Sequence, residues 1–309
     1  MSINQAVIFT KPVHHLRGDL SPEKLNQLTR RFFEEKGFQF VLSKKVTGAD
    51  LKAQEIIKQH YLMYSEAVCA EKVQVAPVAK KRFEDFFGRK WQDEVDAGRI
   101  VPMPRLLERS NVDVYQLFEY WSVLFASGKT VKLQDGLIMG FIEELNLYAI
   151  NAFYPSMEAI FYHPETVLHY HVVEFDSLQI SWKEFRQNVL GKTNASVADP
   201  ESFRGKLYGD YPVEFPGRDN YVHGSAGPLE GFVERTIHED GFEMTTNPVG
   251  AYLAEQGVTL QSFVRWKKNQ SITTLGNLFD ETEEKNTDEI LHSTLERVAG
   301  AIAVSNGTK

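Results

Sequence analysis

The first third of the chain alternates hydrophobic and polar positions in a way that predicts strand, helix, strand, helix. Residues 6–10 (AVIFT) form a short apolar run that is typical of a buried strand. A helix is predicted from Ser21 to Gly37, because Ser21-Pro22 supplies a capping hydroxyl and a first-turn proline. Its apolar residues recur at helical spacing: Leu25, Leu28 and Phe32. A second strand is predicted at 38–42 and a second helix at 49–62.

The pattern of the segment from 67 to 146 differs from that of the residues before it and predicts an insertion with its own hydrophobic core. Ser110 is the expected cap of a helix that ends at Gly128. The apolar face of that helix consists of Val114, Leu117, Phe118, Trp121, Leu124 and Phe125. We therefore expect a folded, mainly helical segment here, and its aromatic residues are interpreted as core.

Regular signals return in the second half of the chain. Residues 167–175 (VLHYHVVEF) predict a strand, and Ser181 with Glu184 fits a capping box that opens a helix to about 190. Residues 191–220 are rich in Gly, Pro, Asp and Asn and predict a long loop. A helix is expected after Gly227-Pro228. Strands and helices joined by short connections predict an α+β or α/β sandwich.

Charge and composition narrow the class of protein. Asp and Glu (42) outnumber Lys and Arg (34), which gives a net charge of −8 and speaks against a nucleic-acid partner. The N-terminus lacks the pattern of a signal peptide, and no stretch approaches the roughly 20 apolar residues of a membrane span. With Cys69 as its single cysteine, the chain is expected to be cytoplasmic, with no membrane association.

Candidate chemistry concentrates between Gly191 and Glu234. This window contains GKTN (191–194), SFRG (202–205) and NYVHGS (220–225). Guanidinium, hydroxyl and amide groups in such a loop suit a phosphate-bearing ligand. His223 precedes a helix start, and an imidazole becomes a competent nucleophile when a carboxylate such as Glu234 orients its other nitrogen.

These motifs resemble those of nucleoside diphosphate kinases. NYVHGS resembles the family's Asn-Ile-Ile-His-Gly-Ser, and GKTN resembles its Gly-Glu-Thr-Asn. The spacing from His223 to Glu234 and from Thr193 to Arg204 is also that of the family. Further similar segments occur in the family's order: Lys11-Pro12, Arg17-Gly18, KGF (36–38), His60-Tyr61 and Phe153-Tyr154-Pro155. The resemblance covers a core of 1–66 and 147–245, leaving an inserted segment of 67–146 and a C-terminal extension of 246–309.

The resemblance implies a ferredoxin-like antiparallel sheet with helices and a ping-pong transfer of a phosphoryl group between nucleoside tri- and diphosphates. His223 would be the nucleophile, Glu234 its orienting carboxylate, and Tyr61 its neighbour. Lys11 would contact the transferring phosphate and the ribose hydroxyl, and Thr193 and Arg204 would hold the outer phosphates. Asn220 would bind the ribose, and Tyr154, where the family has Phe, would stack on the base. Mg²⁺ would arrive on the nucleotide phosphates without a protein cage. A homo-oligomer is also implied, because family members are commonly hexamers or tetramers.

The sequence departs from the family at several positions. The family's second phosphate-binding arginine falls on Gln187, and Arg186 beside it is the candidate replacement. Ala195 and Ala226 stand where the family has Pro and Asp. These departures leave two alternatives open: a specialised phosphotransferase with a non-standard acceptor, or a non-catalytic nucleotide-binding or interaction protein.

Two other patterns are interpreted as having no specific binding function. The pairs His14-His15 and His169-His171 have no clear third ligand at recognised spacing, so no protein-held metal is expected. The acidic run at 280–289 is interpreted as a solvated surface.

Overall fold

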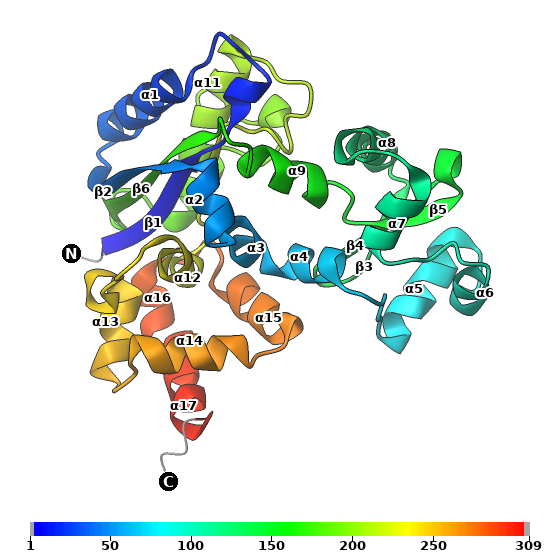
Figure 1. Cartoon of the computed structure of the whole chain (residues 1–309). Helices are drawn as coiled ribbons and strands as arrows, with labels where there is room; N and C mark the ends of the chain where they lie inside the picture. The colour runs from blue at the N-terminus through cyan, green and yellow to red at the C-terminus, as the bar shows by residue number, and fades with distance from the viewer. Residues whose placement is uncertain (1–2, 306–309) are drawn as a thin grey trace. The chain divides into compact units, whose positions relative to one another are not determined.

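A computed structural model describes residues 3–305, apart from the side chains of residues 272 and 273 (Figure 1). The chain forms two compact units. Unit 1 comprises Met1–Gln54 and Pro164–Lys309, and unit 2 comprises Glu55–His163.

A four-stranded antiparallel sheet lies at the centre of unit 1. Its strands are β1 (Ile3–Thr10), β2 (Gln39–Thr47), β6 (Val167–Asp176) and β7 (Val222–Gly224), in the order β2-β6-β1-β7. β1 is an interior strand, and seven of its eight residues are buried. β2 and β6 pair as far as Thr47 and Val167, and the Gly48 N–H donates to the Thr166 carbonyl over 2.8 Å. An antiparallel sheet with helices confirms the predicted α+β class.

One face of this sheet is covered by α1 (Pro22–Glu35), by α10 (Trp182–Glu184) with the π-helical turn Phe185–Leu190, and by α11 (Phe203–Asp210). Ser21 caps α1 by accepting the Lys24 N–H, as the sequence predicted. The buried residues of α1 lie four apart, which turns one stripe of the helix toward the sheet: Leu25, Thr29 and Phe33. The aromatic residues of this core include Phe33, Phe38, Phe185 and Phe203.

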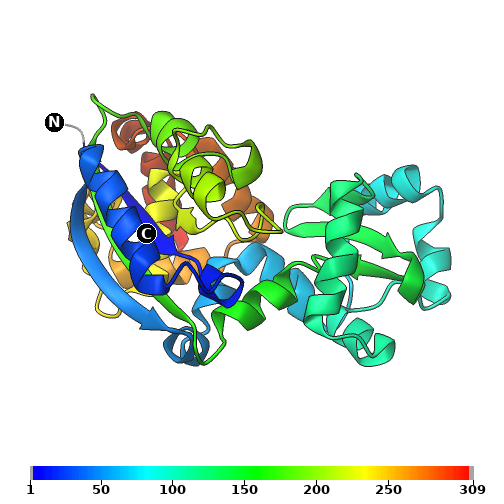
Figure 2. The same cartoon turned by 90° about the horizontal axis from the view of Figure 1, so that it is seen from above.

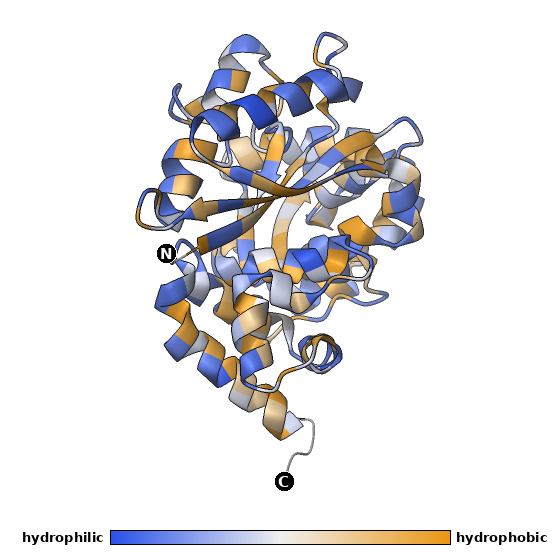
Figure 3. Cartoon of the chain, turned by 90° about the vertical axis from the view of Figure 1, so that its left-hand side faces the viewer, coloured by the Kyte–Doolittle hydropathy of each residue, from blue (hydrophilic) through white to orange (hydrophobic). Residues whose placement is uncertain are grey.

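On the opposite face, α12 (Pro228–His238) and α13 (Pro248–Glu255) contact β1. The helices that follow pack with α12, with one another or with the π-helical turn Leu291–Leu295: α14 (Leu260–Lys268), α15 (Ile272–Thr282), α16 (Thr287–Ile290) and α17 (Glu296–Ser305). Apolar residues of these helices and of this turn make a second core, which includes Phe232, Leu253, Phe263 and Leu295. Figure 3 shows hydrophilic and hydrophobic residues mixed along both the helices and the strands. The C-terminal extension is thus packed into unit 1.

Unit 2 combines helices with a small antiparallel sheet (Figures 1 and 2). The helices are α3 (Ile56–His60), α4 (Leu62–Cys69), α5 (Pro77–Phe87), α6 (Trp91–Asp96), α7 (Met103–Ser110), α8 (Val114–Ala126) and α9 (Tyr154–Phe161). The sheet has the order β3-β4-β5 and consists of Thr130–Gln134, Leu137–Ile142 and Leu147–Ile150. Unit 2 is longer at both ends than the segment 67–146, and its sheet was not predicted from the sequence.

Three predicted elements differ in the structure. The helix expected at 49–62 is broken after α2 (Gly48–Ala53), because Glu55 adopts a left-handed conformation with φ 49°. Ser110 ends α7, and Asp113 caps α8 through a capping box with Gln116. The expected loop 191–220 contains α11, which Ser202 caps. Among residues 3–305, no helix combines the length and apolarity that crossing a bilayer requires.

Candidate functional site

His223 is positioned by the short strand β7. Its backbone lies opposite Phe9 of β1, and the two rings stack with centroids 4.6 Å apart and an interplanar angle of 20°. β7 is short because Gly224 is followed by the turn that leads into α12. This arrangement holds the imidazole against a rigid interior strand, at the place where the chain turns into a helix.

A carboxylate and a hydroxyl complete the surroundings of this imidazole. His223 Nε2 lies 2.6 Å from Glu234 Oε1, on the second turn of α12. The other oxygen of Glu234 accepts a hydrogen bond from Ser225 Oγ over 2.6 Å. Ser225 Oγ in turn accepts the Val7 N–H of β1 over 2.9 Å. Glu234 is 3% exposed, so its position is fixed by these contacts.

The protonation of His223 follows from this geometry. Burial is the largest cause that lowers the pKa of His223 well below its usual value, and the nearby charges of Lys11, Arg204 and Arg186 act in the same direction. The imidazole is therefore neutral at neutral pH. A proton on Nε2 that is donated to Glu234 leaves the lone pair on Nδ1, which is the nucleophilic form of the ring.

Lys11 follows β1 directly, and its environment lowers its basicity. Its Nζ donates to the Arg218 carbonyl over 2.9 Å. Desolvation by burial, followed by the charge of Arg204, lowers the pKa of Lys11 to about 7, although Asp219 opposes this. Arg218 itself is engaged with Asp219 through two hydrogen bonds of 2.7 Å. A bound anion would favour the charged form of Lys11.

Arg204 is fixed by the backbone on both sides of the site. Its Nη1 donates to the Gly191 carbonyl and its Nη2 to the Val222 carbonyl, each over 2.9 Å. Gly191 has φ +93°, and a Cβ there would lie 2.3 Å from Ser202 Oγ. Only glycine fits this turn, which delivers the carbonyl that holds Arg204 next to β7.

Asn220 connects the segment before β7 to the GKTN segment. Its Nδ2 donates to the Thr193 carbonyl over 2.6 Å, and its side chain is 1% exposed. Asn220 Oδ1 is buried and has no hydrogen-bond partner within the described part of the chain. The side chain of Thr193 is exposed. A buried acceptor without a partner is costly, so a ligand hydroxyl or amide would be favourable here.

Three of the implied binding residues, Arg186, Thr193 and Arg204, line a pocket of about 700 Å³. The pocket is lined by Arg186, Gln187, Asn188, Gly191, Lys192, Thr193, Val197, Ala198, Asp199, Pro200, Arg204 and Glu284. Arg186 Nη2 lies 2.9 Å from Glu283 Oε1, and Gln187 Nε2 donates to Glu284 Oε2 over 2.8 Å. Glu283 and Glu284 of the acidic run thus contact Arg186 and Gln187, while the other acidic residues of the run are exposed or half-buried, as the prediction of a solvated surface expects.

Two implied residues belong to unit 2. Tyr61 lies between α3 and α4, and its ring packs edge-on against His60 with centroids 4.7 Å apart. Its role beside the nucleophile stays a prediction. Tyr154 has no exposed surface, and its hydroxyl donates to Glu158 over 2.8 Å. A fully buried ring offers no face to a base, so the structure favours a core role for Tyr154 over base stacking.

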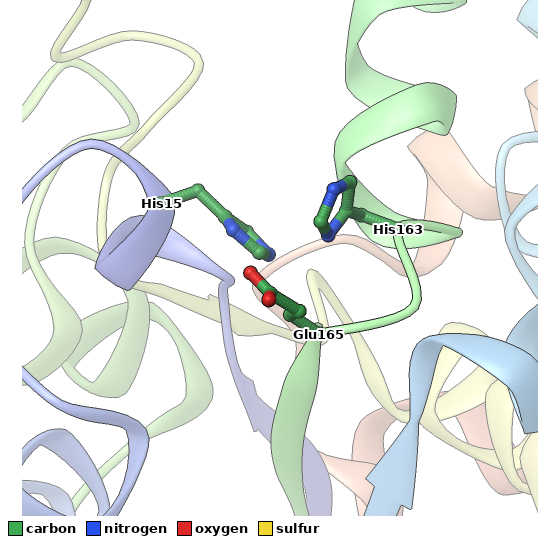
Figure 4. Close-up of side chains that lie close together, drawn as sticks. All are labelled: His15, His163 and Glu165. Carbon is green, nitrogen blue, oxygen red and sulfur yellow. The ribbon is translucent and has the colours of Figure 1, made fainter.

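The His14-His15 pair fastens the turn after β1 to the start of β6. His14 Nε2 lies 3.3 Å from the Glu165 carbonyl, and His15 Nε2 lies 2.7 Å from Thr166 Oγ1. The side chains of His15 and Glu165 point toward one another (Figure 4). Of the other pair, His171 bonds Ser43 and Asn26 through its two ring nitrogens. His14, His15 and His171 thus make hydrogen bonds to neighbouring backbone or side-chain groups.

Sequence reasoning missed several residues of the site. Ser225 lay within the motif, but its bond to Glu234 depends on the pairing of β7 with β1. Asp219 precedes the motif and carried no separate signal. Glu230 lies one turn before Glu234, accepts the Ala226 N–H, and has a pKa raised to about 8, chiefly by burial and then by Glu234. Helical spacing of the two glutamates was the available signal.

Comparison with known proteins gives a distant structural similarity. No family profile and no curated protein sequence matches the chain. The nucleoside-diphosphate kinase from Borrelia burgdorferi, solved with vanadate and ADP, is 15% identical over 78% of this chain and 89% of its own, with a TM-score of 0.36. An NDP kinase from Pyrobaculum aerophilum is 16% identical over 77% and 97%, with a TM-score of 0.37. A nucleoside diphosphate kinase family protein from Babesia bovis is 13% identical over 81% and 98%, with a TM-score of 0.34.

Proposed function

We propose that this protein is a phosphotransferase that moves the terminal phosphoryl group of a nucleoside triphosphate to a nucleoside diphosphate through a phosphohistidine at His223. The observation that carries the proposal is the 2.6 Å contact between His223 Nε2 and a buried carboxylate of Glu234. This contact selects the tautomer whose Nδ1 is a nucleophile. The motif resemblance supports the same role, as does the sheet order β2-β6-β1-β7, which we interpret as ferredoxin-like.

In the first half-reaction, the Nδ1 lone pair would attack the terminal phosphorus, and the bond to the bridging oxygen would break. The nucleoside diphosphate would leave with that electron pair. The phosphorylated ring keeps its Nε2 proton and becomes cationic, and the Glu234 carboxylate would stabilise this charge. A terminal phosphate oxygen of a second nucleoside diphosphate would then take the phosphoryl group, restoring the neutral imidazole.

The cationic residues would bind and position the phosphates. Arg204 is preorganised by two carbonyl contacts, so it loses little freedom on binding an anion. Lys11 lies near enough to His223 to affect its pKa and would contact the transferring phosphoryl group. Arg186 and Thr193 line the pocket that would hold the other phosphates, and the unpartnered Oδ1 of Asn220 would accept a ribose hydroxyl.

Mg²⁺ belongs to the same proposal as a companion of the nucleotide. The pocket lining offers only scattered oxygen donors, such as Asp199 and Thr193, beside three cationic side chains. This set fits an ion that arrives on phosphates and keeps water ligands, and it does not fit a protein cage. When bound, the ion would neutralise part of the phosphate charge. The homo-oligomer implied by the resemblance and the cytoplasmic location expected from the sequence pattern are also part of the proposal.

The decisive experiment is phosphoenzyme formation with γ-labelled ATP and Mg²⁺, followed by a GDP chase, on the native chain and on His223→Gln. Acid-labile, alkali-stable label that requires His223 and moves to GDP is the expected result. Label that forms but stays on the protein would point to a different acceptor. Absence of label in the presence of bound nucleotide would leave a binding protein and contradict the proposal.

A further inference from the structure

The C-terminal extension is seated on the sheet immediately beside the candidate site. Asn286 Oδ1 accepts the Asn4 side-chain amide and the Trp182 N–H, over 2.9 and 2.8 Å. The Thr287 N–H donates to Asn4 Oδ1 over 2.9 Å. These contacts join the extension to the first residues of β1 through partly or fully buried hydrogen bonds.

The same segment closely approaches the start of α12. The Glu284 N–H donates to the Ala226 carbonyl over 3.0 Å, next to Ser225. A Cβ on Gly227 would lie 2.5 Å from the Thr282 carbonyl oxygen, so glycine permits this approach. Glu284 has a left-handed backbone, φ 57°, which directs the chain across the pocket wall. We call Glu283 and Glu284 the acidic turn.

The acidic turn places two carboxylates against groups that would otherwise face a phosphate. Glu283 Oε1 lies 2.9 Å from Arg186 Nη2, and Glu284 Oε2 accepts the Gln187 amide over 2.8 Å. Arg186 is 22% exposed and Glu283 is 41% exposed. The ion pair is thus open enough for a ligand to compete with it. Glu284 itself lines the pocket, opposite in charge to Lys192 and Arg204.

We infer that Glu283 and Glu284 are specificity-determining residues that compete with ligand phosphate for Arg186 and Gln187, so that the pocket disfavours the more highly charged phosphate chains. Two negative charges fixed beside the pocket repel each added phosphate charge. A ligand that reaches Arg186 must also displace Glu283. The inference rests on the proposed function for the identity of the pocket as a phosphate site.

The test is calorimetric titration of the full chain with two probes, ADP and inorganic tripolyphosphate, in EDTA at low ionic strength. The variants are Glu283→Gln and Glu284→Gln, singly and together. Glu296→Gln, an exposed residue of α17 outside the pocket lining, is the control with the same change of charge. Each single pocket variant is expected to bind tripolyphosphate about twofold to fivefold more tightly than the native chain, the range for a partly exposed ion pair.

Three further features of the result are expected. The affinity of the double variant for tripolyphosphate rises more than that of either single variant. The rise in affinity is larger for tripolyphosphate than for ADP, and it becomes smaller as salt is added. The Glu296→Gln control changes neither affinity. Because the expected effect is tighter binding, a loss of folded protein cannot imitate it.

Several outcomes would overturn the inference. Unchanged or weaker binding in both pocket variants would mean that the carboxylates are structural. Weaker binding seen only when the titrations are repeated with Mg²⁺ in place of EDTA would mean that the carboxylates hold the ion. No binding of tripolyphosphate by any variant would remove the phosphate site itself. Tripolyphosphate binding with the expected gain, but no ADP binding, would uphold the inference and contradict only the nucleotide part of the proposed function.

Discussion

Two histidines on β6 and β7, the strands that flank β1 on either side, show how one residue type serves two purposes. His171 on β6 is 1% exposed, and its ring nitrogens bond the neutral side chains of Ser43 and Asn26. His223 on β7 bonds a carboxylate through Nε2, and its side chain is 15% exposed. Burial lowers the pKa of both rings, that of His171 to about 3. Lowered basicity alone therefore does not identify a nucleophile; the charged partner and the residual exposure do.

The strongest test of this comparison removes each histidine in turn and measures both phosphoenzyme formation and stability. His223→Asn is expected to abolish phosphoenzyme while leaving the melting temperature nearly unchanged. His171→Leu is expected to keep the label and to lower the free energy of unfolding by about 1–3 kcal/mol, because two hydrogen bonds of a buried group are lost. Labelling with γ-labelled ATP and urea denaturation measure the two effects. Loss of label in a folded His171→Leu protein would contradict the division.

A milder change than removal of His223 is to remove only the charge of Glu234, its hydrogen-bond partner. Glu234→Gln should lower the rate of phosphorylation by about 100-fold, because an amide orients the ring less firmly and does not stabilise a cationic phosphohistidine. Single-turnover labelling measures the rate, and circular dichroism checks the fold. Asp240→Asn, an exposed residue after the same helix, is the matched control. If the phosphorylation rate of Glu234→Gln is within a factor of two of the native rate, Glu234 has no role in the mechanism.

The smallest effect is expected on the pH dependence of stability. A histidine whose folded pKa is about 3, against 6.5 in the unfolded chain, binds fewer protons when folded throughout that window. The free energy of unfolding therefore falls as the pH drops from 6.5 toward 3. His171→Leu should flatten this dependence relative to the native chain. Melting temperatures between pH 7 and pH 4.5 measure it, and parallel curves would show that His171 is not responsible.

The parts of the structure that depend on local pattern were predictable from the sequence. The predicted α1 and the strand at 167–175 agree with the structure within a few residues, since capping and periodicity act over short distances. The break at Glu55 and the helix α11 inside a Gly-rich segment were missed, because tertiary contacts override weak local preference there. The three strands of unit 2 were hidden for the same reason.

The candidate site likewise contains residues that a local motif predicts and residues that only the fold brings together. His223 and Glu234 were found because they lie eleven residues apart within one motif and the helix after it. The pairing of Arg186 with Glu283 joins residues 97 positions apart. Neither residue indicates its partner, because an acidic run is compatible with a solvated surface until the packing of the extension is known. Long-range charge pairs of this kind are determined by the fold and leave no pattern in the sequence.

The pairing of β2 with β6 has a consequence for how the chain folds. The Gly48–Thr166 hydrogen bond closes a loop that contains all of unit 2. The entropy of closing such a loop grows only logarithmically, by about 0.6 kcal/mol for each doubling of its length. An insertion at this point therefore adds little to the entropic cost of pairing β2 with β6, even when the insertion is long. Replacing Glu55–His163 by a short glycine-rich linker should leave unit 1 able to fold, as a minimal version of the protein.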